Sequence, residues 1–199
     1  MIGFGQSCKS LELDLNDQIV PQYPLVSGSP VPLEFSAEFT IEFWIKTQHN
    51  LQNAAKILYK DNQTAIVGGT NAYGLLDLYL DYNGFVKFKA YSYNSMLLGN
   101  SHTPLISMFP VNDNQWHHIA VLRNNLDEMY MYVDGVVVDQ VQGNSGTVCE
   151  GPNQLSIGSS ALVGGIYQNA LSGNLDNLRI WTKALNQNEI IQYMNQCKV

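Results

Sequence analysis

The sequence predicts an all-β protein, a sandwich of antiparallel strands with one short helix at its C-terminal end. Three observations support this class: many short segments alternate apolar and polar residues, glycine- and asparagine-rich turns separate them, and a helical pattern occurs only near the end. The chain has 199 residues, of which 45% are hydrophobic, and it shows no internal repeat or low-complexity linker. We therefore expect residues 1–199 to form a single domain with one core.

The first clear strand covers residues 39–47, FTIEFWIKT, after a turn-rich stretch at residues 21–32 that is expected to be a long surface loop. Apolar and polar residues alternate along this strand, which is typical of an antiparallel strand with one buried face. The expected core face holds Phe39, Ile41, Phe43 and Ile45, and the opposite face holds Glu42, Trp44 and Lys46. This assignment allows Trp44 to be exposed.

The segment LLDLYLDYNGFVKFKAYSY, residues 75–93, predicts a β-hairpin with two alternative registers. A two-residue turn pairs Leu80 with Lys87, whereas a three-residue loop that ends at Gly84 pairs Leu80 with Val86. Only the second register keeps the apolar residues together on one face, so it is the register that we adopt.

The stretch NQWHHIAVLRNN, residues 114–125, raises the question of a metal or catalytic centre, because two histidines follow a tryptophan. The run from Ile119 to Leu122 predicts a strand, in which neighbouring side chains point to opposite faces. His117 and His118 therefore cannot bind one metal ion together, and tetrahedral zinc needs three or four converging ligands. We expect one histidine to be hydrogen-bonded near the core and the other to lie at the surface.

The next hairpin is predicted by MYMYVDGVVVD, residues 129–139, in which the dipeptide DG at 134–135 is the signal for a two-residue turn. This turn pairs Val133 with Val136 and Met131 with Val138, and we expect that face to belong to the core.

The only helical pattern is at the C-terminal end. Asn186 and Glu189 resemble a capping box, and Ile190, Ile191 and Met194 supply a short apolar stripe. We expect a helix that begins at about Asn186 and packs on the edge of the sandwich.

Charge and composition exclude several kinds of partner. The net charge is −7 and the pI is about 4.9, and the lysines and arginines are dispersed, so nucleic acid is not an expected partner. No run approaches the ~18 consecutive apolar residues of a membrane span.

Cys8, Cys149 and Cys197 permit at most one internal disulfide, and which of them pair stays open. An extracellular or surface location is favoured, although the first ten residues contain no visible signal peptide.

Several segments occur in an order that resembles the laminin-G-like, concanavalin A-like lectin domains, including the pentraxins and the first lectin-like subdomain of clostridial neurotoxin binding regions. These segments are SLELDLND, FSAEFTIEFWIKT, NQWHHIAVLRN, MYMYVDGVVVDQ and LSGNLDNLRIWTKALNQNEI, and together they cover nearly the whole chain. The resemblance implies a jelly-roll sandwich of two antiparallel sheets, a fold that is usually used to bind glycans or proteins.

The same superfamily contains glycoside hydrolases, whose strand motif is Glu-x-Asp-x-Glu or a near variant. The closest run here is Glu12-Leu13-Asp14-Leu15-Asn16, in which an amide replaces the third acidic group. Asn16 cannot donate and recover the proton that retaining hydrolysis requires. Glu38 and Glu42 form a second acidic pair, for which solvated strand carboxylates are the commoner explanation. We therefore expect no catalytic activity.

The resemblance also suggests calcium. Pentraxins hold two calcium ions through a carboxylate-rich loop, but the matching stretch here, residues 155–173, contains no acidic residue. Many relatives instead carry one structural calcium ion that joins the first and last strands, and Asp14, Asp17 and Asp176 are the matching acids. The alternative is that Asp14 and Asp17 flank a turn while Asp176 pairs with solvent or with Arg179.

The adopted register of residues 75–93 leaves a candidate ligand surface on the outside of the hairpin. This surface consists of Asp77, Tyr79, Lys87, Lys89, Tyr91 and Tyr93. Sugar rings stack their C–H groups on aromatic faces, and a tyrosine combines an apolar ring with a hydroxyl that stays in water. The alternative is that these aromatic residues are present because they are good strand formers.

Two classes of function follow. The first is a non-catalytic carbohydrate-binding, lectin-like module whose partner is a glycan or glycoprotein. The second is a protein-interaction or structural module of a cell-surface, adhesin or viral assembly, with a homo-oligomer or a fixed assembly partner.

Overall fold

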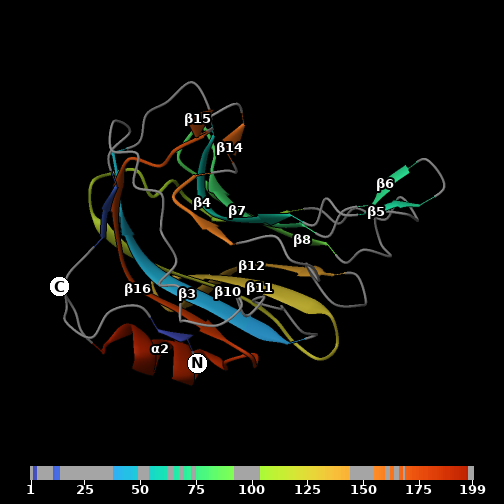
Figure 1. Ribbon diagram of the computed structural model, residues 1–199. Coiled ribbons are helices and arrows are strands. Elements are labelled where there is room, and N and C mark those ends of the chain that lie inside the picture. The colour runs from blue at the N-terminus through green and yellow to red at the C-terminus, as the bar shows by residue number, and fades with distance from the viewer. Residues whose placement is uncertain are drawn as a thin grey trace.

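Two antiparallel sheets stacked face to face form a jelly-roll β-sandwich, as predicted (Figure 1). The computed structural model describes residues 2–3, 11–13, 38–48, 54–61, 65–67, 70–72, 75–91, 104–143, 155–159, 162–163, 166–167 and 169–196. The turn-rich stretch at residues 21–32 and the three cysteines lie outside these ranges.

The larger sheet has seven strands. Its order is β1 (Ile2–Gly3), β16 (Gly173–Trp181), β3 (Phe39–Lys46), β10 (Trp116–Arg123), β11 (Glu128–Val133) and β12 (Val136–Gln142), with β2 (Leu11–Leu13) also paired to β16. The last long strand, β16, therefore lies between the first strands of the chain and β3. Strands from both ends of the chain are therefore neighbours in this sheet.

The smaller sheet has five strands. Its order is β13 (Ser156–Ile157), β4 (Ala55–Asp61), β7 (Leu75–Leu80), β8 (Val86–Tyr91) and β9 (Leu105–Ile106). Two short ribbons are not paired with either sheet. The ribbon of β5 (Ala65–Val67) and β6 (Thr70–Ala72) projects away from the sandwich, and that of β14 (Leu162–Val163) and β15 (Ile166–Tyr167) lies beside β4 (Figure 1).

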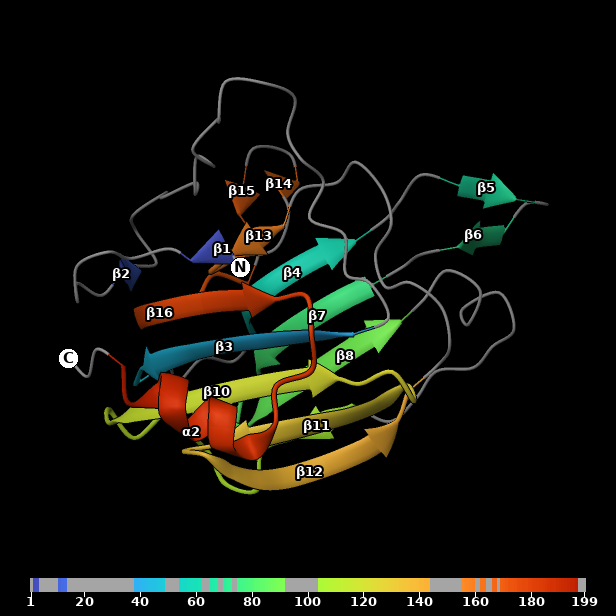
Figure 2. The ribbon, with the colours of Figure 1, turned by 90° about the horizontal axis from the view of Figure 1, so that it is seen from below.

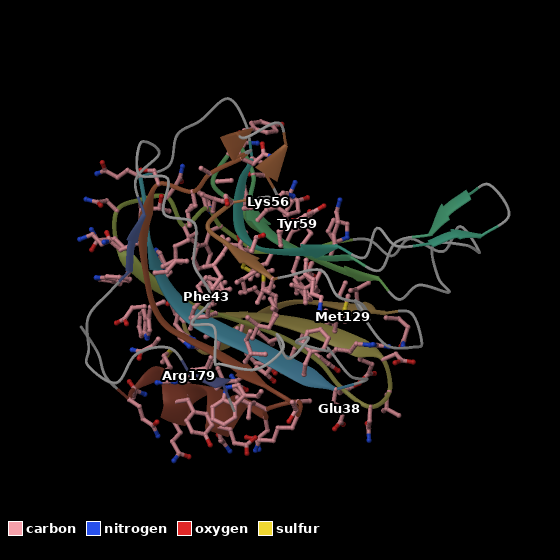
Figure 3. All side chains as sticks on the ribbon, viewed as in Figure 1. Glu38, Phe43, Lys56, Tyr59, Met129 and Arg179 are labelled. Carbon is pink, nitrogen blue, oxygen red and sulfur yellow. The ribbon has the colours of Figure 1, made fainter. Side chains whose placement is uncertain are left out.

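The core lies between the two sheets and is built from the alternating apolar residues of their strands. The four predicted core residues of β3 are all at most 1% exposed, and Phe43 points toward the smaller sheet (Figure 3). Across the sandwich, the inward residues of the β7–β8 hairpin are at most 3% exposed, and Leu80 pairs with Val86 as the three-residue loop requires. Trp44, on the outer face of β3, is half-buried rather than exposed.

The β11–β12 hairpin follows its prediction at the turn and in the burial of Met131 and Val133, but not in its full register. Val133 pairs with Val136 as expected, but a β-bulge then shifts the register, so that Met131 pairs with Asp139 and not with Val138. The shift lets the Asp139 carboxylate accept the N–H of Ile106 at 2.9 Å, which ties this edge strand to the smaller sheet. Val136 is 60% exposed, so the expectation that it belongs to the core is wrong.

The terminal helix α2 (Gln187–Met194) has the predicted capping box, in which the Asn186 side chain accepts the N–H of Glu189 and the Glu189 side chain accepts the N–H of Asn186. It packs on the outer face of the larger sheet rather than on the edge (Figure 2). The reason is that Ala120 and Leu122 on the outward side of β10 need an apolar cover, which Ile190 helps to supply. No helix among the described residues is both long and apolar enough to cross a membrane.

Candidate functional site

The outer face of the smaller sheet carries the candidate ligand surface. Strands β4 and β7 bend toward the β14–β15 ribbon, so this face is concave (Figure 1). On β4, β7 and β8 the described outward side chains are Lys56, Tyr59, Asp77, Tyr79, Lys87 and Lys89, which we call the tyrosine–lysine face. Asp77 is buried, and the other five are partly exposed.

The structure places four of the predicted ligand residues together on this face. The register of β7 and β8 sets Asp77 opposite Lys89 and Tyr79 opposite Lys87, as predicted. The side chain of Tyr91, at the end of β8, and all of Tyr93 lie outside the described part of the chain.

Two further members of the face, Lys56 and Tyr59, were not predicted from the sequence. They come from β4, where Lys56 pairs with Tyr79 and Tyr59 pairs with Asp77. Residues three apart in a regular strand point to opposite faces, but the register of β4 shifts between Lys56 and Leu58, so both side chains point outward (Figure 3). The only signal in the sequence is the break in alternation at the adjacent buried residues 57–58.

Lys56 and Asp77 form the centre of the face. The Lys56 Nζ atom lies 2.7 Å from both carboxylate oxygens of Asp77, 4.8 Å from the centroid of the Tyr79 ring and 5.2 Å from that of the Tyr59 ring. Burial raises the pKa of the Asp77 carboxyl above its ordinary value, and the Lys56 ammonium offsets this effect only in part. One ammonium thus contacts one carboxylate and two aromatic rings.

The β7–β8 turn holds the edge of the face in place. Asp81 Oδ1 accepts the N–H groups of Asn83 and Phe85, and Asp81 Oδ2 lies 2.9 Å from Lys87 Nζ. Burial alone would raise the pKa of the Asp81 carboxyl, but these hydrogen bonds outweigh it and hold that pKa below its ordinary value. Gly84 has a φ of 86°, in the left-handed region that favours glycine.

The two histidines of β10 lie on opposite faces of the larger sheet, as predicted. His118 is 1% exposed on the outer face, where its ring contacts Trp44 edge-on at 5.4 Å. His117 lies on the other side, with Nδ1 2.9 Å from Asp134 Oδ2 and Nε2 3.2 Å from Asp113 Oδ1. Within the described ranges, no three histidine, cysteine or acidic side chains come together as metal ligands.

Glu42 is buried beside His118, so the expectation of a solvated carboxylate is wrong for this residue. It is 0% exposed, and its Oε1 atom accepts hydrogen bonds from Arg179 at 3.2 Å and from the indole of Trp181 at 3.0 Å. Its Oε2 atom lies 3.6 Å from His118 Nε2 and has no hydrogen-bond partner in the described part of the chain. Arg179 also donates to the Tyr193 carbonyl at the C-terminal end of α2. This cluster therefore joins the sheet to the helix.

Of the three candidate calcium ligands, only Asp176 belongs to the described residues. Its carboxylate is 6% exposed and accepts the backbone N–H of Asn177 at 2.7 Å. Arg179, the alternative partner of Asp176, bonds to Glu42 instead. Asp14 and Asp17 lie outside the described residues.

Solved structures with the same fold include several binding domains. A native heptameric SAP-like pentraxin from Limulus polyphemus has a TM-score of 0.55 and 18% identity over 78% of this chain and 69% of its own. The CBM40 module of the Ruminococcus gnavus IT-sialidase, bound to α2,3-sialyllactose, has a TM-score of 0.57 and 14% identity over 79% of this chain and 82% of its own.

A third similar structure is the ligand binding domain of botulinum neurotoxin serotype D in complex with N-acetylneuraminic acid. Its TM-score is 0.58 and its identity 17%, over 82% of this chain. The match spans only 37% of the neurotoxin domain. At these identities, the likeness concerns the fold.

A comparison with curated protein sequences finds no match. A family model described as the concanavalin A-like lectin/glucanases superfamily, however, matches residues 22–191, which is most of the chain. The protein therefore belongs to the concanavalin A-like lectin/glucanases superfamily.

Proposed function

We propose that the protein is a non-catalytic carbohydrate-binding module and that its ligand contacts the tyrosine–lysine face. The observation that carries this proposal is the placement of two tyrosine rings around one ammonium on the concave side of the smaller sheet. Two of the similar structures hold a sugar ligand, sialyllactose in one and N-acetylneuraminic acid in the other, which supports the same class of ligand here.

The chemistry of the face suits a sugar. Tyr59 and Tyr79 offer apolar ring surface for the C–H groups of a sugar ring, while their hydroxyls and the lysine ammonium groups can bond to sugar hydroxyls. Lys56 holds both rings before a ligand arrives, so that less conformational freedom is lost on binding.

The acidic groups near this face support binding rather than hydrolysis. A retaining glycosidase needs two carboxylates about 5 Å apart, one as nucleophile and one as acid/base. Asp77 binds Lys56 through both of its oxygens, and Asp81 is engaged by Lys87 and by the turn. Neither carboxylate is placed to exchange a proton with a substrate.

A protein-interaction role is the second candidate, and one observation favours it. Exposed apolar side chains occur on two neighbouring loops, with Tyr82 63% exposed on the β7–β8 turn and Met108 71% exposed after β9. These loops are joined by a hydrogen bond from the Val111 N–H to the Gly84 carbonyl. Apolar groups gathered in this way are typical of contacts between proteins.

A glycan array decides between the two candidates. Wild-type protein should bind a defined set of glycans, and Tyr79→Ala should lose that binding. Tyr82→Ala is the matched control, because it removes a tyrosine from the same hairpin but from outside the tyrosine–lysine face. Loss of binding in Tyr82→Ala alone would place the contact on the loops, and no glycan binding by the folded wild type would reject the proposal.

A further inference from the structure

The tyrosine–lysine face, together with its β7–β8 turn, has an unusual charge for this protein. Its described side chains include three lysines, Lys56, Lys87 and Lys89, against two aspartates, Asp77 and Asp81, which gives these five residues a net charge of +1. The chain as a whole has a net charge of −7. The net charge of the chain therefore repels a ligand with a negative group, whereas these five residues together attract it.

The three lysines are not equivalent. Lys56 is neutralised by a two-oxygen ion pair with Asp77 at 2.7 Å, and Lys87 pairs with Asp81 at 2.9 Å. Lys89 forms no ion pair with any described residue, although it lies opposite Asp77 in the register, because both oxygens of Asp77 face Lys56. Its ammonium acts on the Asp77 carboxylate only at longer range, and it is the one cation of this face that forms no ion pair with a described residue.

The position of Lys89 ties this charge to the proposed sugar contact. Its Nζ atom lies 5.7 Å from the centroid of the Tyr79 ring, and its side chain is partly exposed. A negative group that pairs with Lys89 would place the attached sugar beside Tyr79. The strand register fixes the relative position of these two side chains, since Tyr79 and Lys89 belong to paired strands.

We infer that the tyrosine–lysine face selects glycans that carry a negatively charged group, a carboxylate or a sulfate, and that Lys89 determines this preference. The inference rests on the proposed function, since it assigns the ligand class of the same face. Lys56 and Lys87 keep the tyrosines and the hairpin in place, whereas Lys89 supplies the charge that the ligand uses.

The test uses an array in which each neutral oligosaccharide is printed beside its sialylated and sulfated counterparts, for example lactose, α2,3-sialyllactose and sulfated lactose. Wild-type protein should prefer the charged members, and Lys89→Gln should reduce their binding by about tenfold or more, because a hydrogen bond to a charged group is lost. Lys89→Arg should retain the preference. Lys46→Gln, on the outer face of the larger sheet, is the matched control for loss of one positive charge and should bind as the wild type does.

The possible outcomes separate this inference from the proposed function. If Tyr79→Ala abolishes binding but Lys89→Gln keeps the preference for charged glycans, the site is correct and the role of Lys89 is wrong. If wild type binds neutral and charged members equally, the selection for charge is refuted while carbohydrate binding stands. If no glycan of either kind binds, both proposals fail. The ratio of sialylated to sulfated binding identifies which negative group is preferred.

Discussion

Replacing Arg179 by methionine should destabilise the protein strongly, because Arg179 compensates a carboxylate that is wholly buried. Glu42 is 0% exposed, and the Arg179 guanidinium is its one hydrogen-bonded cation among the described residues. Removing one partner of a buried ion pair typically costs about 3–5 kcal/mol, since the other charge is left without compensation. The variant also loses the bond from Arg179 to the Tyr193 carbonyl, which holds the end of α2.

We expect the free energy of unfolding to fall by about 3 kcal/mol, near the lower end of that range, for two reasons. In the variant, Glu42 keeps the hydrogen bond from Trp181. The Arg179 side chain is 15% exposed, and the free-energy cost of desolvating its guanidinium is absent from the variant. For a domain of this size, this loss should lower the melting temperature by roughly 6–12 °C. Urea denaturation followed by tryptophan fluorescence measures the change in the free energy of unfolding.

Two further variants test the reasoning behind this number. Replacing both Glu42 and Arg179 by apolar residues of similar volume should restore much of the lost stability, because no buried charge then remains. Lys183→Met removes a cation from the exposed pair with Glu189, and it should leave the unfolding midpoint unchanged. A loss below about 1 kcal/mol in Arg179→Met, or a double variant no more stable than the single one, would refute the account of this cluster.

Four other predictions concern the core, the turn, the metal and the ligand. Phe43→Ala should cost roughly 3–5 kcal/mol in urea denaturation, because Phe43 is 0% exposed between the sheets, and a loss well below 1 kcal/mol would show that the face of β3 is misassigned. The pKa of the Asp81 carboxyl is lowered by folding, so its stabilising effect is complete above its ordinary value of 3.8 and is lost as the pH falls through the lowered value. The stability difference between wild type and Asp81→Asn should therefore shrink on acidification below pH 3.8, and a difference that grows would contradict this sign. Calcium, if it binds, should raise the melting temperature in wild type and not in Asp176→Ala, whereas calorimetry with neither heat nor a thermal shift would remove the metal from the account. Tyr91→Ala should weaken glycan binding at least about tenfold with a far smaller effect on stability, and unchanged binding would place the ligand elsewhere.

Local sequence patterns were sufficient for much of the sandwich. The alternation along residues 39–46 identified the buried face of β3, and the position of Gly84 identified the register of the β7–β8 hairpin. Both features depend on residues that are close together in the chain. The capping box at Asn186 was readable for the same reason.

The features that were missed depend on contacts between distant segments. Lys56 and Tyr59 reach the candidate site only through a register shift in β4, and the β-bulge in β12 is linked to a contact between Asp139 and β9. Glu42 is buried because β16 and α2, more than 130 residues later, cover its face of the sheet. Alternation within one strand carries no information on such covering elements.

Backbone NMR chemical-shift mapping shows whether a glycan binds to the tyrosine–lysine face. The glycan that binds best on the array is added to uniformly labelled protein, and the shifted resonances are located on the structure. We expect the largest changes on Lys56, Tyr59, Tyr79 and Lys89 and their strand neighbours, at the concave side of the smaller sheet. Changes confined to α2 or to the loop that contains Met108 and Phe109, with the tyrosine–lysine face unaffected, would contradict this expectation.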